Sequence, residues 1–369
     1  MTMDWYIIDD IDKLDTPALV VYPDRVKENI RLAKSLVDDV NRLRPHVKTH
    51  KSGDVTRLML EAGISKFKCA TIAEAEMLAL NEAPDVLLAY QPSGPKLERL
   101  VKLIETYRFT RFSCLVDNVS SVENISDAAE RNSLILDVYI DLNIGMNRTG
   151  IQPGEQAIEL YQLCDSLPGI NIKGLHAYDG HIHDVDINEL THHCHESYRP
   201  VAKLQSGLKK LGYNPVIIAG GSPTFPIHAQ REDIEVSPGT FVYWDKNYQL
   251  DCPTQPFIPA ALVVARIVSL PTSTTICIDC GHKSIASENE LNKRICFLNA
   301  PELKMTGHSE EHLVADAGEK HYYKVGDILY GLPYHICPTV ALYERAITIE
   351  NNQVAGEWKN TARDRRINI

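Results

Sequence analysis

The sequence has no excess of basic residues, because 38 lysines and arginines stand against 49 aspartates and glutamates and leave a formal net charge of −11. Proteins that bind nucleic acid usually carry a basic surface, so the charge argues against that class. No apolar run reaches the roughly 20 residues that span a bilayer. The first residues show neither the basic nor the apolar region of an export signal. We expect a cytoplasmic protein that binds neither nucleic acid nor membrane.

The sequence also lacks a cysteine framework and a dinucleotide fingerprint. Its nine cysteines are an odd number without regular spacing, which is typical of reduced thiols in a cytoplasm. Cys277 and Cys280 have no second pair, and His192–His195 lies in a polar helical stretch where adjacent side chains point in different directions. We favour no metal role for either. No Gly-x-Gly-x-x-Gly follows an early strand, which argues against an open dinucleotide-binding sheet.

What the sequence does contain is an alternation of short apolar strands and amphipathic helices from residue 44 to about residue 245. Such an alternation predicts a parallel sheet with crossover helices. About eight strands can be counted, the number that closes a (β/α)8 barrel of the TIM type. An open doubly wound sheet is the alternative.

A second, all-β domain is predicted after the barrel, because helical periodicity fades and short β-rich runs follow, several of them separated by glycine and proline. The strand-like run Ala18–Tyr22 has no place in the barrel and is expected to join this domain. The predicted division is residues 25–245 for the barrel and residues 1–24 plus 246–369 for the β-rich domain.

The alternation starts with a basic stretch, residues 44–51. Pro45 favours extended backbone, so the stretch is predicted to be a short strand with a polar tip, where α/β barrels keep their chemistry. A lysine whose amine is kept partly neutral by nearby cations can form a Schiff base with a carbonyl cofactor. Lys48, with His46 and His50 beside it, is the candidate. A basic loop in solvent is the alternative.

Three more positions could carry chemistry. Gly220, Gly221 and Ser222 follow a late strand and could cradle a phosphate, although an ordinary tight turn has the same composition. Arg148 follows another strand and could reach a cofactor oxygen with its planar donor fork, or pair with a carboxylate. The β-rich part contains the motif Pro-x-His-x-Cys, in which one residue separates a histidine from a cysteine, both common metal ligands. On a strand they would point to one face and offer half of a zinc site, or else be a buried cysteine beside a half-exposed histidine.

Taken in order, five motifs resemble one enzyme family. They are Arg-Pro-His-x-Lys-Thr-His-Lys at 44–51, Gly-Met-Asn-Arg-Thr-Gly at 145–150, Gly-Leu-His-Ala-Tyr-Asp-Gly-His at 174–181, Gly-Gly-Ser-Pro-Thr at 220–224 and Pro-x-His-x-Cys at 333–337. Nearly the whole chain resembles the metal-activated D-threonine aldolase and D-serine dehydratase family. These are fold-type III, alanine-racemase-like pyridoxal-phosphate enzymes. The resemblance implies a homodimer with active sites at the subunit interface.

The resemblance also implies residue roles. Lys48 anchors pyridoxal 5'-phosphate and acts in catalysis, Arg148 lies near the phenolic oxygen of the cofactor, and Tyr178 lies beside its ring. His183 is matched to a histidine implicated in substrate deprotonation, although the loop spacing differs. The full cofactor-binding set is His46, Lys48, Arg148, Tyr178, Gly220, Gly221, Ser222 and Tyr243, and the metal ligands are His335 and Cys337.

The function implied is that of a lyase of D-β-hydroxy amino acids that needs pyridoxal phosphate and a divalent metal. Aldolase-like cleavage to glycine and an aldehyde is the first expectation, because the barrel motifs are closer to the aldolases. A dehydratase of D-serine or D-threo-3-hydroxyaspartate type is the alternative, because Cys337 matches the dehydratase ligand where the aldolases have aspartate. A thiolate suits Zn²⁺, and a carboxylate suits Mn²⁺ or Mg²⁺. A metal-independent racemase and a non-enzymatic cofactor carrier are the remaining alternatives, and the β-rich domain argues against the carrier.

Overall fold

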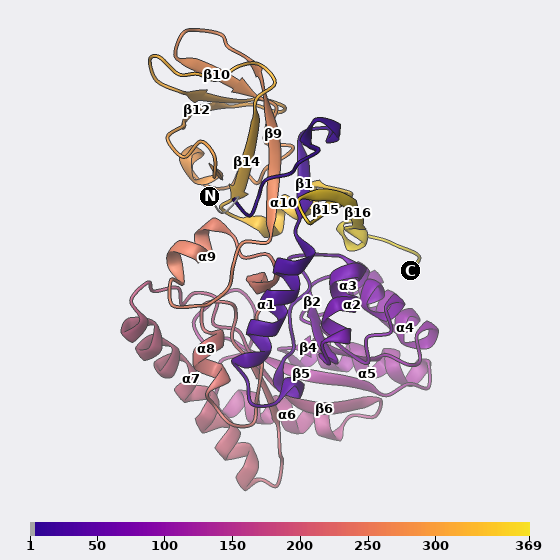
Figure 1. Ribbon diagram of the computed structural model, residues 1–369. Coiled ribbons are helices and arrows are strands. Elements are labelled where there is room, and N and C mark those ends of the chain that lie inside the picture. The colour runs from indigo at the N-terminus through magenta and orange to yellow at the C-terminus, as the bar shows by residue number, and fades with distance from the viewer. Residues whose placement is uncertain (1–3) are drawn as a thin grey trace.

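The protein consists of an α/β barrel and a second domain of mostly β structure, drawn above the barrel in Figure 1. The computed structural model describes residues 4–369. The predicted fold class, a barrel with a second β domain, is confirmed. Within the described range, no helix is long and apolar enough to cross a membrane.

The barrel is built on a seven-stranded parallel sheet whose strands lie side by side in sequence order. Short apolar strands that are buried on both faces are typical of parallel sheets, and the alternation in the sequence predicts each of them. The strands are β2 (Lys66–Cys69), β3 (Asp85–Leu88), β4 (Arg111–Val116), β5 (Leu136–Leu142), β6 (Ile170–Ala177), β7 (Val216–Ala219) and β8 (Ile234–Val236).

An extended segment before the second helix fills the eighth position and closes the barrel. Leu43 forms a parallel bridge with Val236 on β8, and His46 forms one with Lys68 on β2. Pro45 has no N–H to give to a ladder, which is one reason why the segment does not form a regular strand.

Helices cover the outside of the barrel, and several begin where a strand ends. Ser52, Thr71 and Asn118 each accept a backbone N–H with their side chains and so cap the helix that follows. Polar residues at these tips therefore serve the fold as well as the site. The helices are α1 (Pro23–Ser35), α2 (Gly53–Glu61), α3 (Ile72–Leu80), α4 (Pro95–Thr106), α5 (Val119–Arg131), α6 (Glu155–Ser166), α7 (Ile187–Lys210) and α8 (Phe225–Ala229).

The second domain is organised on a nine-stranded sheet that begins with the N-terminal strand β1 (Ala18–Val21). This strand pairs antiparallel with β9 and parallel with β15, so the chain starts in the second domain before it enters the barrel. The other strands are β9 (Ala261–Ser269), β10 (Thr275–Ile278), β11 (Ile295–Phe297), β12 (Lys304–His308), β13 (Leu313–Asp316), β14 (Ile328–Pro333), β15 (Arg345–Glu350) and β16 (Gln353–Lys359). Two short helices, α9 (Lys246–Asp251) and α10 (Ile336–Leu342), and 3₁₀ turns at Ile11–Lys13, Val40–Arg42, Thr240–Val242, Leu291–Lys293 and Thr361–Arg363 complete the elements.

The predicted metal motif is not on a strand, and this is a correction. Strand β14 ends at Pro333, His335 is the N-cap of α10, and Cys337 lies in the first turn of that helix. Pro338 also lies in this turn, where the missing N–H of proline costs no helical hydrogen bond. The two ligand-type residues therefore owe their proximity to a helix start and not to the alternation of a strand.

Candidate active site

A cavity of about 640 Å³ lies at the end of the barrel where the parallel strands finish. Active sites of (β/α)8 enzymes lie at this end, and the volume is ordinary for a small-molecule site. The lining combines apolar side chains with a majority of cationic or polar ones. Those that bear on chemistry are His46, Lys48, Lys68, Gln91, Asp141, Arg148, His176 and Tyr178.

Lys48 and His46 are both half-buried and line this cavity, as the sequence predicts for a cofactor site. The backbone N–H of Lys48 donates to Nδ1 of His46 at 3.2 Å, which fixes the orientation of the imidazole. Burial, followed by the charges of Lys48 and Lys68, lowers the pKa of His46 well below its ordinary value. The imidazole is therefore neutral at pH 7 and serves as an acceptor.

Tyr178 forms a platform for two cations. The Arg148 Cζ lies 5.2 Å from the centroid of the tyrosine ring, and the Lys68 Nζ lies 5.7 Å from it, distances at which a cation is attracted to a ring face. The same ring supports the glycine loop, because a Cβ added to Gly221 would lie 3.0 Å from Tyr178 Cε2. The structure thus brings Arg148 and Tyr178 together beside the predicted phosphate loop.

The loop after β7 has the features of an anion site. Gly220 has a φ of +83°, a conformation that favours glycine. Oγ of Ser222 accepts the backbone N–H groups of Gly239 at 3.3 Å and Thr240 at 3.1 Å. Backbone amides from the following segment therefore gather at this hydroxyl, as they do in anion-binding nests.

Tyr243 is buried, and its hydroxyl has no hydrogen-bond partner among the residues described. Burial raises the pKa of Tyr243, so the phenol remains a neutral donor. A buried hydroxyl without a partner costs free energy. An oxygen of a bound phosphate group would supply the missing acceptor, which is consistent with the predicted role of Tyr243.

The two predicted metal ligands approach the barrel from the second domain. Sγ of Cys337 lies 3.1 Å from the Thr49 hydroxyl, one residue beyond Lys48, and Nδ1 of His335 lies 2.5 Å from a carboxylate oxygen of Glu288. Burial alone would raise the pKa of the Cys337 thiol, but a hydrogen bond from His335 and the charge of Lys48 lower it overall. A thiol with a lowered pKa, beside an imidazole held by a carboxylate, is a suitable donor set for zinc.

Two family models match successive parts of the chain. The model of the alanine racemase, N-terminal domain, matches residues 21–247, and a serine dehydratase domain model matches residues 260–349. The chain belongs to the alanine racemase N-terminal domain family. The predicted resemblance to alanine-racemase-like enzymes is therefore confirmed.

Several relatives that match almost the whole chain are lyases, as expected. A D-threonine aldolase of Arthrobacter sp is 27% identical over 96% of this chain and 94% of that protein. A D-threo-3-hydroxyaspartate dehydratase of Delftia sp. is 26% identical over 89% and 93%. The crystal structure of a D-threonine aldolase from Filomicrobium marinum matches with a TM-score of 0.87 and 25% identity, covering 95% of both chains.

The motifs assign no role to Asp141, His176 or Lys68, which also line the cavity of this racemase-family barrel. Asp141 and His176 join through Oδ1 and Nδ1 at 2.8 Å, and burial lowers the pKa of His176 even against the effect of Asp141. Lys68 is the third. His176 lies within one of the quoted motifs and could have been predicted from it. Lys68 lies inside a strand with no motif that distinguishes it.

His183 is not brought to the cavity in the single chain. It is exposed, in the loop before α7, and it is not among the lining residues. His181, two residues earlier, packs its ring on Gly145, where an added Cβ would lie 2.3 Å from Nε2. A catalytic role for His183 remains a prediction from the resemblance.

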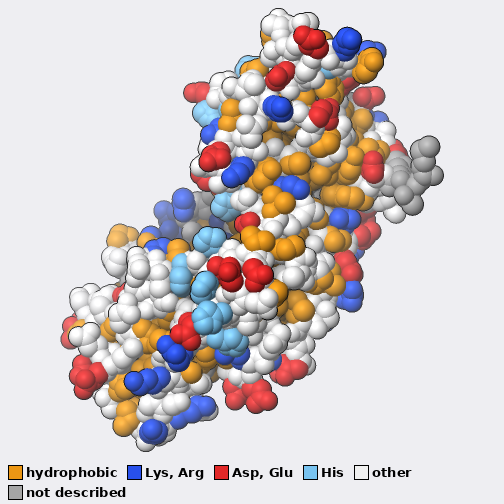
Figure 2. Space-filling model, turned by 90° about the vertical axis from the view of Figure 1, so that its left-hand side faces the viewer, with side chains coloured by type: hydrophobic (Ala, Val, Ile, Leu, Met, Phe, Trp, Pro, Cys, Tyr) orange, Lys and Arg blue, Asp and Glu red, His pale blue; other side chains and the backbone are white. Residues whose placement is uncertain are grey.

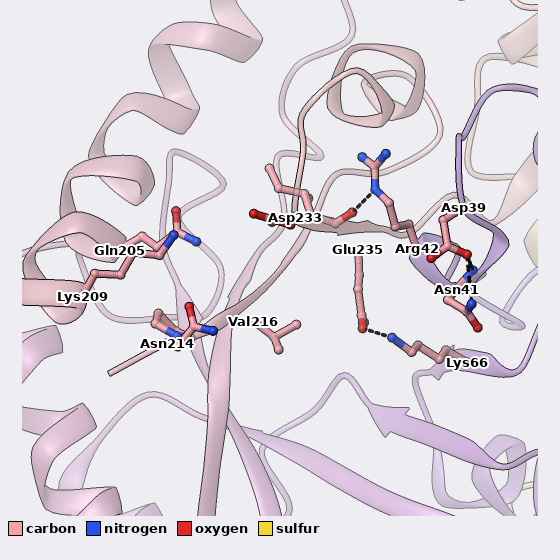
Figure 3. A pocket seen from close by; sticks show the side chains of 12 residues that line it. Asp39, Asn41, Arg42, Lys66, Gln205, Lys209, Asn214, Val216, Asp233 and Glu235 are labelled. Carbon is pink, nitrogen blue, oxygen red and sulfur yellow. Dashed lines mark hydrogen bonds and ion pairs between the residues drawn. The ribbon is translucent and has the colours of Figure 1, made fainter. Parts of the chain in front are cut away.

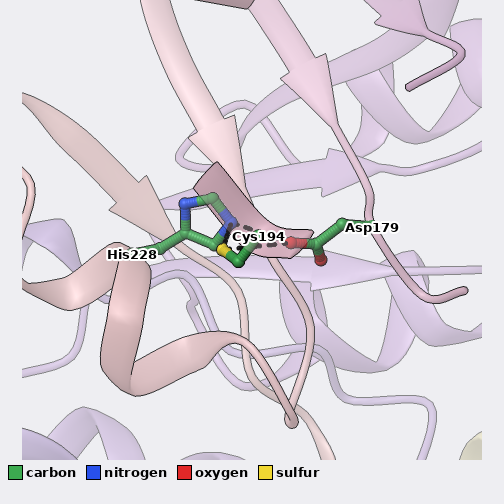
Figure 4. Close-up of side chains that lie close together, drawn as sticks. All are labelled: Asp179, Cys194 and His228. Atoms are coloured by element: carbon green, nitrogen blue, oxygen red, sulfur yellow. Dashed lines mark hydrogen bonds and ion pairs between the residues drawn. The ribbon is translucent and has the colours of Figure 1, made fainter. Parts of the chain in front are cut away.

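A buried cluster behind the glycine loop contains Asp179, Cys194 and His228, whose ligand-type atoms lie within 4.8 Å of one another (Figure 4). Nε2 of His228 lies 2.8 Å from Asp179 Oδ2, and Thr224 donates to Asp179 Oδ1 at 2.8 Å. Burial raises the pKa of Cys194 to about 12, so the thiol is protonated. These contacts form a hydrogen-bonded support for the loop. Cys194 is thus separated by burial from its exposed neighbours in the histidine run.

Two other surface features do not belong to the candidate site. A cavity of about 340 Å³ lies at the opposite end of the barrel, where Lys66 and Glu235 form an ion pair (Figure 3). Figure 2 shows histidines gathered in a band on one face of the barrel, and α7 carries the exposed His192, His193 and His195. His193 is paired with Asp184 at 2.8 Å, an ordinary surface contact.

Proposed function

We propose that this protein is a lyase of D-β-hydroxy amino acids that uses pyridoxal 5'-phosphate and a divalent metal, and that carbon–carbon cleavage to glycine and an aldehyde is its main reaction. One observation carries the proposal. Thr49, next to the predicted anchoring lysine, contacts the predicted metal ligand Cys337 at 3.1 Å. The amine of Lys48 and the imidazole–thiol pair therefore serve one site.

The residues present suit the cofactor. Lys48 would hold its aldehyde carbon, Arg148 and Tyr178 would flank it, and Ser222 with the amides near it would hold its phosphate. The unpartnered hydroxyl of Tyr243 fits this assignment. When bound, pyridoxal phosphate supplies an electron sink for a carbanion.

The residues present also suit a metal. His335 and Cys337 would hold Zn²⁺ or Mn²⁺, with Mg²⁺ as a further option, and Glu288 would orient the imidazole. When bound, the ion supplies a Lewis acid for the substrate hydroxyl. The thiol favours zinc, because soft ligands select that ion over manganese or magnesium.

The chain's own side chains then have defined tasks. The Lys48 amine accepts or returns a proton at Nζ, and the neutral His46 ring accepts the Lys48 backbone N–H and so holds the lysine turn. Asp141 orients His176 through its Oδ1 and is itself held by Gln91 at 2.9 Å. These contacts fix the floor of the cavity before any ligand enters.

Dehydration to a keto acid and ammonia is the second candidate function. The observation that favours it is Cys337, whose pKa is lowered by His335 and Lys48 against the effect of burial, because the resemblance places cysteine at this position in dehydratases. A racemase would need no metal pair. A cofactor carrier would need no second domain.

The test is incubation of the purified protein with D-threonine, D-serine and D-threo-3-hydroxyaspartate in the presence of Mn²⁺ or Zn²⁺. Glycine with an aldehyde supports the main proposal, and a keto acid with ammonia supports the alternative. Racemised substrate without either product pair would contradict both. In a parallel measurement, Lys48→Ala should lose the visible absorption of the bound cofactor, and retention of that absorption would place the anchor elsewhere.

We also propose a cytoplasmic homodimer with shared active sites. Side chains at the cavity mouth remain uncovered in the single chain, with Tyr90 42% exposed, Arg148 exposed and Met146 half-exposed. A second subunit would cover them. Light scattering on the eluted protein should give twice the mass of one chain, and a monomer with full turnover would contradict the shared site.

A further inference from the structure

Lys68 is a second lysine in the cavity. It lies on β2 beside His46, its partner in a parallel bridge, and it is only 3% exposed. Its side chain lines the same cavity as Lys48. Buried lysines are rare unless a partner compensates the charge.

The ammonium of Lys68 has no such partner among residues 4–369, because neither a hydrogen bond nor an ion pair reaches it. Its described electrostatic contact is the Tyr178 ring, 5.7 Å away. Burial, followed by the charge of Lys48, lowers the pKa of Lys68 to about 7, although Asp141 and Asp179 act in the opposite direction. The charged amine is therefore poorly compensated by the protein.

The two nearby carboxylates are already engaged. Asp141 accepts at Oδ2 from Gln91 and faces His176 with Oδ1. Asp179 is held by Thr224 and His228. Neither is within ion-pair distance of Lys68, so the group that compensates this lysine must come from the contents of the cavity.

We propose that Lys68 is a ligand-binding residue whose ammonium holds an anionic oxygen of the molecule bound beside Lys48. The inference rests on the proposed function, which supplies two sources of such an oxygen, the cofactor ring and the carboxylate of the amino acid. Lysine suits either one, because it is a compact charge with rotatable donors. Arg148, on the same Tyr178 ring, presents a second cation beside it.

The test compares Lys68→Met with Lys68→Arg in the holoenzyme. Methionine keeps the length and removes the charge, and burying it in place of an unpaired ammonium should not unfold the protein. Lys66→Met is the matched control, because Lys66 is on the same strand and its amine pairs with Glu235 at the opposite end of the barrel. Three quantities are measured: the affinity for pyridoxal phosphate, the visible spectrum against pH, and the affinity for D-alanine, which has no hydroxyl to cleave.

Loss of one charged hydrogen bond should weaken binding roughly ten- to hundredfold. If the cofactor oxygen is the partner, Lys68→Met weakens cofactor binding and shifts the spectrum before amino acid is added. If the substrate carboxylate is the partner, the spectrum is unchanged and only D-alanine binding falls. Lys68→Arg should recover part of either loss.

Wild-type values for all three quantities in Lys68→Met would overturn the proposal, as would an equal loss in Lys66→Met. If Lys68→Met does not fold, Lys68→Gln gives the same comparison with a polar side chain. A colourless wild-type protein after incubation with the cofactor would instead contradict the proposed function, so the two failures are distinguishable.

Discussion

The imidazole of His335 is the residue at which metal and cofactor chemistry can be separated. Its Nδ1 is held by Glu288, and it lies in a different domain from Lys48. His335→Ala should reduce lyase turnover at least about a hundredfold, the upper part of the range for groups around a metal, and leave the visible absorption of the cofactor in place. His312→Ala, at an exposed position of the same domain, is the control. Unchanged turnover would remove the metal pair from the reaction.

Another single residue should make the protein sensitive to acid. His50 is fully buried and burial lowers its pKa to about 3, while its ordinary pKa is near 6.5. The folded state therefore rejects a proton that the unfolded state accepts below pH 6.5. The free energy of unfolding should fall as the pH drops from about 6.5 toward 3, with about 2 kcal/mol lost by pH 5.

The measurement is urea unfolding at pH 7 and pH 5 with saturating cofactor. His50→Asn keeps an acceptor for the Ser52 N–H, which His50 Nδ1 now accepts at 3.1 Å, and removes the titrating ring. Its loss of stability between the two pH values should be smaller by about 2 kcal/mol. His312→Asn should keep the full loss, and equal losses in all three proteins would show that His50 titrates normally.

Prediction from sequence worked at the residue scale where a motif lies at a strand end. Lys48, Arg148 and Tyr178 all line the cavity, because barrel strands direct their ends to one place. The cavity position of Lys68 could not be predicted, since the face to which a mid-strand residue points depends on a register that only the folded sheet determines. The site roles themselves stay predictions until they are tested.

At the scale of elements, the alternation of strand and helix is well predicted and the start of α10 is not. Periodicity identifies each barrel strand, because each is a short apolar run between polar tips. The run Pro333–Cys337 has no such period, and its proline content suits a strand edge and a helix start equally. Strands β12 and β16 were also unexpected, and the half-exposed face of β16 gives only a weak hydrophobic signal.

The glycine loop is an element whose support can be tested. Oγ1 of Thr224 accepts the Gly221 N–H at 3.2 Å and donates to Asp179 at 2.8 Å, so it ties the loop to the buried cluster. Thr224→Val breaks both hydrogen bonds and should weaken pyridoxal phosphate binding about tenfold. Pyridoxal without its phosphate should be affected less, because the loop is assigned to the phosphate.

Titration of the apoprotein by visible absorption gives both affinities. Thr224→Ser retains the hydroxyl and should bind like wild type. An equal loss of affinity for the two cofactor forms in Thr224→Val would mean that the loop does not bind the phosphate group.

At the scale of the whole molecule, the chain crosses between its two bodies more than once. Strand β1 belongs to the second sheet, the chain then forms the barrel, and it returns to the second domain after α9. The return places Cys337 against Thr49 of the barrel. The proposed site, with its metal ligands and its cofactor lysine in different bodies, would exist only when the two bodies are docked. The separate patterns of the two halves of the sequence cannot reveal this docking.

Removal of the metal should therefore affect both turnover and the stability of the docked molecule. A ligand that binds only the native protein raises its free energy of unfolding, and the increase grows with the ratio of ligand concentration to dissociation constant. At a ratio of one hundred the increase is about 2.7 kcal/mol. Treatment with a chelator should abolish lyase turnover, leave the cofactor colour and lower the Tm of the holoprotein, and added Zn²⁺ or Mn²⁺ should restore both. In Cys337→Ala the chelator should leave the Tm unchanged. Lyase turnover that survives the chelator would remove the metal from the reaction. Racemised substrate without lyase products would favour the metal-independent racemase. In either case the His335–Cys337 pair would be a structural contact between the domains.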